Sequence, residues 1–418
     1  MRKRKLTRQG VVGCIMGIVI AACSGCGAAH RASTDSTPAP PVPTGQQTVD
    51  VPAAIARSMT DQQLIGQLVM TKITATELTA DEARVLRRGE LNGVILFGWN
   101  DDGRTALRSL TADIARSGAT VSTGMPAAAT YVVGSLVAAD QEGGGIRALP
   151  SVPPDRSQQS WGDDPQAAAD IRRADAQAGV AMRDVGITVN LAPVADLPVG
   201  PHQVMAARSF GLHPSTSVAS AAAGFQHGGI AATVKHFPGL GGASRNTDEG
   251  IAHVTRSRAQ IVGEDLQPFR DAADIGVLLV MTSHAIYDNL GSTVPATIDR
   301  AIVHDLLRRE LGASAVVISD SLNAKGVREA SNMTTPQLCP AAAAAGVDIL
   351  LLTGSLETAK LCRTRLHAAL ANPASGFTHQ QLIDAATRVL RLKQHLGLIR
   401  DARTNQPMLA PDHRCCAP

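Results

Sequence analysis

The chain has 418 residues, of which 44% are hydrophobic, 18% are charged and 2% are aromatic. This composition is typical of a globular protein with one large domain or two smaller ones, and the core must be filled by aliphatic side chains. The formal net charge of +3 becomes −2 without residues 1–22, which hold five Lys or Arg and no acid, so nothing favours nucleic acid as a partner.

The first 22 residues have the pattern of an export signal. Arg2 to Lys5 and Arg8 form a basic segment, and the apolar run from Val11 to Ala22 is too short to span a bilayer. The segment ends in Ala21-Ala22-Cys23, which is similar to a bacterial lipobox. We therefore expect acylated Cys23 to anchor the protein in the cell membrane, on its extracytoplasmic face. Acylation of Cys26 and a plain cleaved signal are the alternatives.

The rest of the chain divides into a tether, one domain and a tail. Residues 23–50 are rich in Ser, Thr, Pro and Ala and predict a disordered tether, because this composition buries little apolar area. Residues 51–400 form the folded domain, and residues 401–418 are too few for another. Cys339 and Cys362 flank one predicted strand and could form a disulfide. No Cys-x-x-Cys pair has a matching partner, so we expect no metal and no cofactor.

Eight short apolar runs predict buried strands, and helical patterns lie between most of them. The predicted strands are Gln67–Thr71, Gly93–Gly98, Val132–Asp140, Ile187–Asp196, Ile230–His236, Val277–His284, Ala315–Asp320 and Asp348–Leu352. The predicted helices include Thr60–Leu68, with a capping box between Thr60 and Gln63, Pro165–Val185, Ser215–His227, Arg300–Leu311 and Thr378–Leu396. Eight such units over about 340 residues fit an α/β fold, a single (β/α)8 TIM-type barrel, better than an open doubly wound sheet.

Polar side chains stand at the carboxyl ends of the predicted strands, where a (β/α)8 barrel carries its active site. Asp140 ends the third strand, Asp196 the fourth, Lys235-His236 the fifth and Asp320 the seventh. Each alone could be a helix cap or an ion-pair partner. Together they place carboxylates and bases on one rim, which is the pattern of an active site.

Five motifs occur in order at these strand ends. They are Asp140-Gln141-Glu142-Gly143-Gly144, Asn190 to Asp196, Arg208-Ser209-Phe210-Gly211, Lys235-His236-Phe237-Pro238-Gly239 and Ile318-Ser319-Asp320-Ser321-Leu322. From about Thr60 to Leu398 the chain resembles the single-domain bacterial members of glycoside hydrolase family 3. These are exo-acting β-N-acetylglucosaminidases of peptidoglycan recycling.

The resemblance implies hydrolysis of terminal β-linked GlcNAc from peptidoglycan fragments, with retention of configuration. Asp320 matches the family nucleophile, which forms the glycosyl-enzyme. Asp140, Arg208, Lys235 and His236 match positions that hold the hydroxyls of the terminal sugar. A nearby cation such as Lys235 would also keep Asp320 ionised. We expect a monomer that acts on GlcNAc-terminated muropeptides.

Two departures from the family concern the proton donor and one substrate contact. The family uses the His of an Asp-Ser-His as general acid/base in the loop after Lys-His-Phe-Pro-Gly, whereas Gly250 stands at that position here. Asp248, Glu249 and His253 are the candidate donors, and Asp248 is favoured because a neighbouring carboxylate or burial can raise the pKa of a carboxylic acid. Arg147 is the remaining candidate for a family Arg that contacts substrate, displaced by one position.

Other readings stay open at this point. Trp99 could stack on a sugar or pack locally, and for His284 a packed position on the rim is expected. The protein could also be a family 3 β-glucosidase, although many of these take their acid/base from an additional domain. It could be a glycoside phosphorylase, against which a carboxylate donor argues. It could finally be a lipid-anchored glycan-binding protein that does not turn its ligand over.

Overall fold

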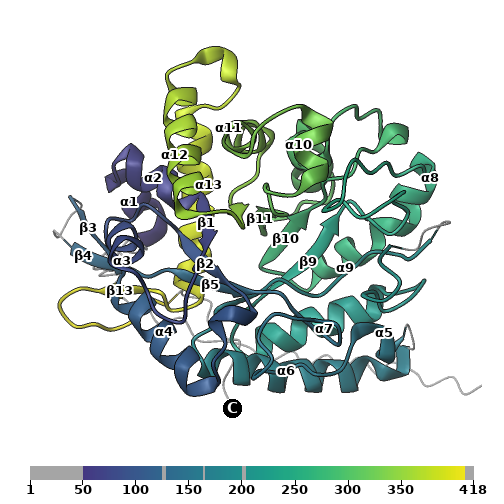
Figure 1. Ribbon diagram of the computed structural model, residues 1–418, viewed down its shortest axis with the longest axis horizontal. Coiled ribbons are helices and arrows are strands. Elements are labelled where there is room, and N and C mark those ends of the chain that lie inside the picture. The colour runs from purple at the N-terminus through teal and green to yellow at the C-terminus, as the bar shows by residue number, and fades with distance from the viewer. Residues whose placement is uncertain (1–49, 125–128, 163–164, 200–203, 410–418) are drawn as a thin grey trace, which may run out of the picture. The chain divides into compact units, whose positions relative to one another are not determined.

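Eight parallel strands form the central sheet of the computed structural model, which describes residues 50–124, 129–162, 165–199 and 204–409 (Figure 1). The strands are β1 Val69–Lys72, β2 Gly93–Leu96, β5 Leu136–Ala139, β8 Val189–Asn190, β9 Ala231–Phe237, β10 Leu279–Thr282, β11 Val316–Ser319 and β12 Leu350–Leu352. They are neighbours in chain order, and a bridge between Ile318 and Ile349 joins β11 to β12. The sheet therefore closes into the predicted (β/α)8 barrel. The predicted signal, Cys23 and the tether up to residue 49 lie outside the described residues.

The strand side chains alternate between two apolar cores. Met70, Leu136 and Ile318 point inward and pack inside the barrel. Val137 and Leu350 point outward and pack under the surrounding helices. Both faces of each strand are thus buried, which is why the sequence shows short continuous apolar runs instead of alternating ones.

One helical segment follows each barrel strand. These segments are α3 Ala80–Arg87, α4 Arg104–Arg116, α6 Ala168–Asp184, α7 Ser215–His227, α9 Gln267–Asp274, the π-helical Ala301–Glu310, α11 Thr335–Ala345 and α12 Leu356–Leu370. Short helices in the connections are α5 Gln158–Trp161, α8 Arg258–Gln260 and α10 Lys325–Ser331. A disulfide between Cys339 and Cys362 joins α11 to α12, as the sequence suggested. Within the described ranges, no helix is long and apolar enough to cross a membrane.

The amino-terminal end of the barrel is closed by α13 (His379–His395). Leu392 of this helix packs with the inward-facing strand side chains. The neighbouring Lys393 is buried, and its Nζ donates to Gln67 Oε1 at 2.8 Å, shortly before β1 begins. This contact fixes α13 against the amino ends of the strands.

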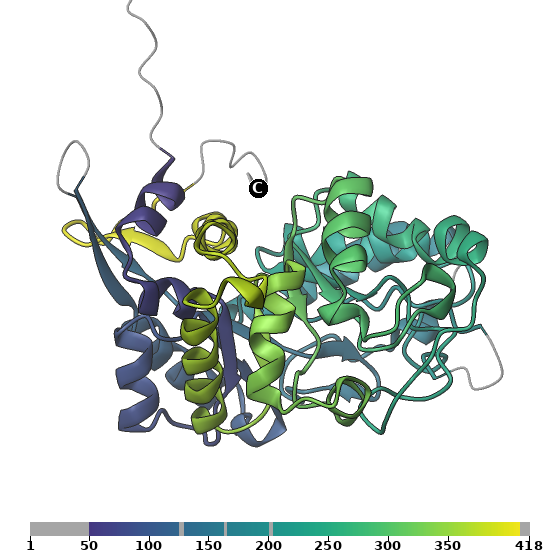
Figure 2. The same cartoon turned by 90° about the horizontal axis from the view of Figure 1, so that it is seen from above.

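The domain begins at this same closed end. α1 (Val51–Ser58) packs along α13, and Asp50, its N-cap, pairs with Arg391 of α13 at 2.6 Å (Figure 2). α2 (Asp61–Gln67) then leads into β1, and Thr60 forms the expected capping box. The carboxyl ends of the strands, which the sequence singled out, therefore lie at the opposite end of the barrel from residue 50.

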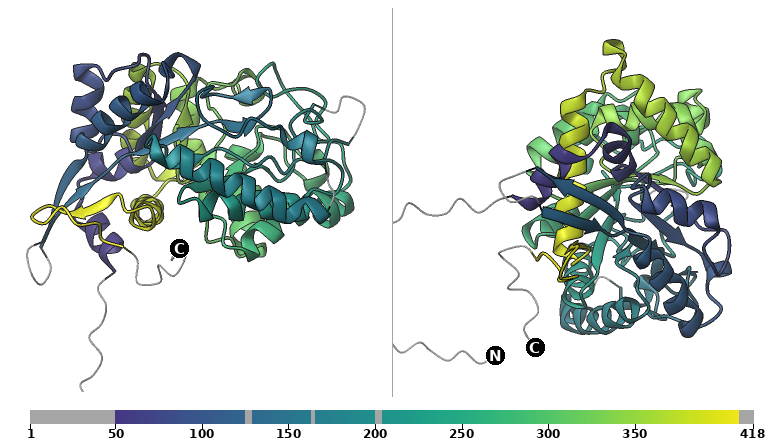
Figure 3. Two further views of the ribbon diagram at one scale, coloured as in Figure 1. Left: turned by 90° about the horizontal axis from the view of Figure 1, so that it is seen from below. Right: turned by 90° about the vertical axis from the view of Figure 1, so that its left-hand side faces the viewer.

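Two small antiparallel sheets lie outside the barrel (Figure 3). Their strands are β3 Ala119–Thr123, β4 Ala129–Val133 and β13 Ile399–Asp401 in one sheet, and β6 Gln141–Gly143 and β7 Ile146–Arg147 in the other. The prediction of one strand over Val132–Asp140 is therefore wrong in its first part. Val132 and Val133 belong to β4, and Gly134 and Ser135 belong to neither β4 nor β5.

Candidate active site

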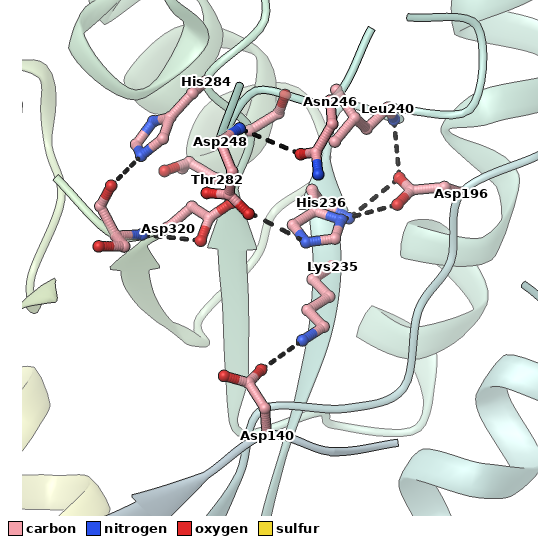
Figure 4. A network of polar contacts seen from close by, with 12 residues as sticks. Asp140, Asp196, Lys235, His236, Leu240, Asn246, Asp248, Thr282, His284 and Asp320 are labelled. Atoms are coloured by element: carbon pink, nitrogen blue, oxygen red, sulfur yellow. Dashed lines mark hydrogen bonds and ion pairs between the residues drawn. The ribbon is translucent and has the colours of Figure 1, made fainter. Parts of the chain in front are cut away.

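A pocket of ≈ 370 Å³ opens at the carboxyl ends of the barrel strands. Its wall combines charged side chains with apolar ones such as Phe97 and Leu240. Seven of the residues that the sequence selected line it, namely Asp140, Arg147, Arg208, Lys235, His236, Asp248 and Asp320. Figure 4 shows how the polar groups from β9, the loop after it and the end of β11 converge.

A buried charge cluster forms one wall of the pocket. Glu142 accepts two hydrogen bonds from Arg208, at 3.0 Å from Nε and 2.6 Å from Nη2, and its Oε1 lies 2.7 Å from Lys235 Nζ. The same Nζ donates to Asp140 Oδ1 at 2.7 Å. Burial would raise the pKa of Glu142, but the charges of Lys235 and Arg208 lower it to about 2. Glu142 is therefore ionised, and both cations are held in place before a ligand binds.

His236 is positioned by Asp196, a buried carboxylate in the connection between β8 and α7. The Nδ1 atom of His236 lies 2.7 Å from Asp196 Oδ2, and the backbone N–H groups of His236 and Leu240 donate to Oδ1 at 3.1 and 2.7 Å. The Nε2 atom lies 4.0 Å from Asp320 Oδ2. Because one ring nitrogen is held by a carboxylate, the orientation of the imidazole is fixed.

Lys235 and His236 both line the pocket, although successive side chains of a regular strand point to opposite faces. A cis peptide bond joins the two residues.

Asp320, the predicted nucleophile, directly follows β11. Its Oδ1 atom accepts a hydrogen bond from the backbone N–H of Ser321 at 2.7 Å. Burial would raise the pKa of Asp320, but the charges of His284 and His236, with smaller contributions from the Ser321 N–H and Lys235, together hold the pKa below its ordinary value. The charge of Lys235 also lowers the pKa of Asp320, as the sequence predicts, although its contribution is smaller than that of either histidine. The ammonium of Lys235 is engaged by two carboxylates.

His284 is buried on the rim with both ring nitrogens bonded. Nδ1 lies 2.9 Å from Thr297 Oγ1, and Nε2 lies 2.9 Å from the backbone carbonyl oxygen of Ser321. Burial lowers the pKa of His284, so its positive charge acts on Asp320 only in the acid range. This is the packed position that the sequence suggested for it.

Asp248 lies on the long loop that follows β9. Asp248 as a whole residue is exposed, but partial burial of its carboxyl, and after it the charge of Asp320, raises the pKa of Asp248 above its ordinary value. Its neighbour Glu249 is exposed as well and does not line the pocket. His253 is also outside the wall, where its Nδ1 lies 2.9 Å from Asp288 Oδ2. Of the three candidate proton donors, Asp248 alone shares the pocket with Asp320.

The sequence of residues 59–392 matches the family model described as the N-terminal domain of glycosyl hydrolase family 3. This chain belongs to glycosyl hydrolase family 3. A family relative named beta-hexosaminidase, from Nitrosospira multiformis, is 31% identical over 317 residues, which cover 74% of this chain and 86% of that protein.

Solved family 3 structures share this fold. A beta-N-acetylglucosaminidase from a Paenibacillus species superposes with a TM-score of 0.71 and 28% identity, over 81% of this chain and 63% of that one. LpqI from M tuberculosis superposes with a TM-score of 0.69 and 26% identity, over 82% of this chain and 96% of that one. This chain thus spans less than two thirds of the Paenibacillus protein and nearly the whole of LpqI.

Arg147, the candidate for the displaced family 3 arginine, lines the pocket from β7. Its Nη1 pairs with Asp155 Oδ1 at 2.8 Å, and its Nη2 donates to the carbonyl oxygen of Pro150. Trp99 is not part of the wall. Its ring stacks on Phe97 with a centroid distance of 4.6 Å, and its Nε1 donates to a backbone carbonyl. These contacts are local packing, but Trp99 is 52% exposed beside Phe97, which lines the pocket, so stacking on a sugar stays a prediction.

Two residues that hold the wall of this family 3 pocket, without lining it, were not assigned a role from the sequence. Glu142 anchors Lys235 and Arg208, and Asp196 anchors His236 and the start of the following loop. Both acids lie inside the motifs quoted above, so an acid at a buried strand end was the available signal. In the ranges that the structure describes, no group of His, Cys, Asp or Glu is arranged to hold a metal ion.

Proposed function

We propose that this chain is a retaining exo-β-N-acetylglucosaminidase that removes terminal β-linked GlcNAc from peptidoglycan fragments. The observation that carries the proposal is a pair of carboxyl groups in one pocket whose pKa values are moved apart. The pKa of Asp320 is lowered and that of Asp248 is raised. Retaining glycosidases need such a pair, one carboxylate to attack and one acid to donate a proton. The names of the family 3 relatives support the choice of sugar.

In the first half of the proposed reaction, the Asp320 carboxylate attacks C1 of the terminal sugar. The bond from C1 to the leaving oxygen breaks as a bond from C1 to Asp320 forms, and Asp248 gives its proton to that oxygen. In the second half, the Asp248 carboxylate takes a proton from water. The resulting hydroxide attacks C1 and releases Asp320, so the sugar leaves with its original configuration.

The charged wall suits recognition of the terminal sugar. Lys235, Arg208 and His236 present donors, and Asp140 presents acceptors, at positions already fixed by Glu142 and Asp196. Prepositioned donors and acceptors avoid the cost of ordering long side chains when the sugar binds. Arg147 lines the same pocket and serves as a further contact to substrate.

We further propose that the protein is a monomeric lipoprotein, which acylated Cys23 anchors on the extracytoplasmic face of the membrane. The disulfide between Cys339 and Cys362 supports this location, because such bonds persist mainly in oxidising compartments. The lipobox-like sequence before Cys23 supports the anchor. The test is metabolic labelling with a clickable fatty acid, which should label the wild-type chain and leave the Cys23→Ser variant unlabelled.

Release of p-nitrophenol from the GlcNAc aryl glycoside tests the activity. Asp320→Asn should abolish the release. Asp248→Asn should lower it and regain turnover with azide, giving a β-glycosyl azide, whereas Glu249→Gln is the matched control on the same loop and should behave as wild type. A wild-type protein that binds muropeptides but releases no aglycone from any aryl glycoside would contradict the proposal and favour a glycan-binding role.

A further inference from the structure

The loop that carries Asp248 is braced against the helix that follows Asp320. The backbone N–H of Gly326, in the first turn of α10, donates to the carbonyl oxygen of Thr247 at 2.8 Å. Gly326, Thr247 and Gly250 are all buried at this contact. The residue before the proposed proton donor is thus tied directly to the segment after the nucleophile.

This contact requires that position 326 has no side chain. A Cβ atom at Gly326 would lie 2.3 Å from the carbonyl oxygen of Gly250 and 2.5 Å from that of Thr247. Atoms of an ordinary contact do not come so close, and both oxygens belong to the backbone, so no side chain can rotate away to make room. Any substitution at 326 must move the loop or the helix.

The helix side of the contact is the more firmly held. Between Asp320 and α10 the chain is bound to the end of β12, because Leu322 N donates to Leu351 O at 3.0 Å. The side-chain oxygen of Asn323 accepts from the N–H groups of Thr353 and Gly354, each at 2.9 Å. The loop side lies largely on the surface around Asp248 and Glu249. We therefore expect a substitution at 326 to displace the loop rather than the nucleophile.

We infer that Gly326 is a positioning residue, which sets the place of the Asp248 carboxyl relative to Asp320 and to the leaving oxygen of the substrate. The inference rests on the proposed function. It explains how the proton donor Asp248 is held in a chain that has Gly at position 250. A Cβ at Gly250 would lie 3.0 Å from Arg245 Nη1 and 3.6 Å from Glu329 Oε2, and neither of these residues lines the pocket. A side chain at 250 would thus point away from the substrate, and the donor's place depends on the backbone contact.

The test compares two substrates in the Gly326→Ala variant. The dinitrophenyl glycoside of GlcNAc has a leaving group that needs no proton, whereas a GlcNAc-terminated disaccharide needs one. The loss of a general acid typically costs about 10²–10⁴-fold. For Gly326→Ala we expect kcat/KM to fall about 100-fold or more on the disaccharide and only a few-fold on the dinitrophenyl glycoside. Gly263→Ala is the matched control, because a Cβ at 263 meets nothing within 4 Å.

Several outcomes would overturn the inference. Equal losses on both substrates would mean that the substitution damages the whole site, and no loss would mean that the contact does not position the donor. If Gly326→Ala does not fold, hydrogen exchange in the wild-type protein decides, since the Gly326 amide must then be protected as strongly as amides of the barrel strands. Exchange of the Gly326 amide at the rate of an exposed loop would refute the hydrogen bond to Thr247 as a stable contact. A wild-type protein that turns over neither substrate would instead refute the proposed function itself.

Discussion

The buried carboxylate of Glu142 offers a direct measure of how much the charge cluster stabilises the fold. Its side chain is 2% exposed and is held by Arg208 and Lys235. Its pKa falls from the ordinary 4.5 to about 2, and at about 1.4 kcal/mol per pKa unit this corresponds to about 3 kcal/mol of folding free energy at neutral pH. Removing one partner from a buried ion pair costs about 3–5 kcal/mol, which is the same range.

The pH dependence of this stabilisation follows from the direction of the change. Because the pKa of Glu142 is lower in the folded state, the stabilisation is complete above pH 4.5 and is lost as pH falls toward about 2. About half of it should remain at pH 3. Glu142→Gln removes the carboxylate, so the variant should be about 3 kcal/mol less stable than wild type at pH 7, and the difference should shrink at pH 3.

Urea denaturation of the wild type and the Glu142→Gln variant measures the loss of stability at pH 7 and at pH 3. Glu249→Gln is the control, since Glu249 is exposed and lies outside the pocket. A Glu142→Gln variant that loses less than about 1 kcal/mol at pH 7 would refute the reasoning. So would a loss that is the same at both pH values, because the carboxylate would then not be the cause.

Three further predictions concern the reaction and the fold. The pH profile of kcat/KM should be bell-shaped, because activity is lost at low pH as Asp320 becomes protonated and at high pH as Asp248 loses its proton. Asp248→Asn should remove the alkaline limb of the profile, and an unchanged limb would exclude Asp248 as the acid. Adding Gly250→His to Asp248→Asn should restore no more than a few per cent of activity, because a side chain at 250 points away from the pocket; full recovery in the same assay would contradict that geometry. Replacing Cys339 and Cys362 by Ser should lower the free energy of unfolding by about 3 kcal/mol, because the disulfide joins residues 23 positions apart. An unchanged midpoint in thermal or urea unfolding would show that the disulfide does not stabilise the domain.

The barrel could be predicted because each strand is buried on both faces and leaves a short apolar run in the sequence. The break between β4 and β5 could not, because Val132, Val133 and Leu136 are apolar on both sides of Gly134-Ser135. The strand predicted over Ile187–Asp196 is also too long, for a different reason. Pro193 has no N–H to donate, and beyond Asn190 the pairing continues only as a single bridge at Val194.

The rim residues of the site could be predicted because the carboxyl ends of parallel strands meet at one end of the barrel. The ion-pair partners of these residues could not be predicted. Glu142 and Lys235 are far apart in the sequence, and their contact depends on the placement of β5 and β9 on either side of β8. The sequence therefore predicts the effect of the Lys235 charge on Asp320, but not the ion pairs of Lys235 with Glu142 and Asp140.

The placement of α1 has a consequence for large substrates. Asp50, the first described residue, pairs with Arg391 at the closed end of the barrel, where α1 lies along α13. The pocket opens at the other end, and none of the residues that line it belongs to α1 or α13. A long glycan can therefore enter the pocket without displacing either helix.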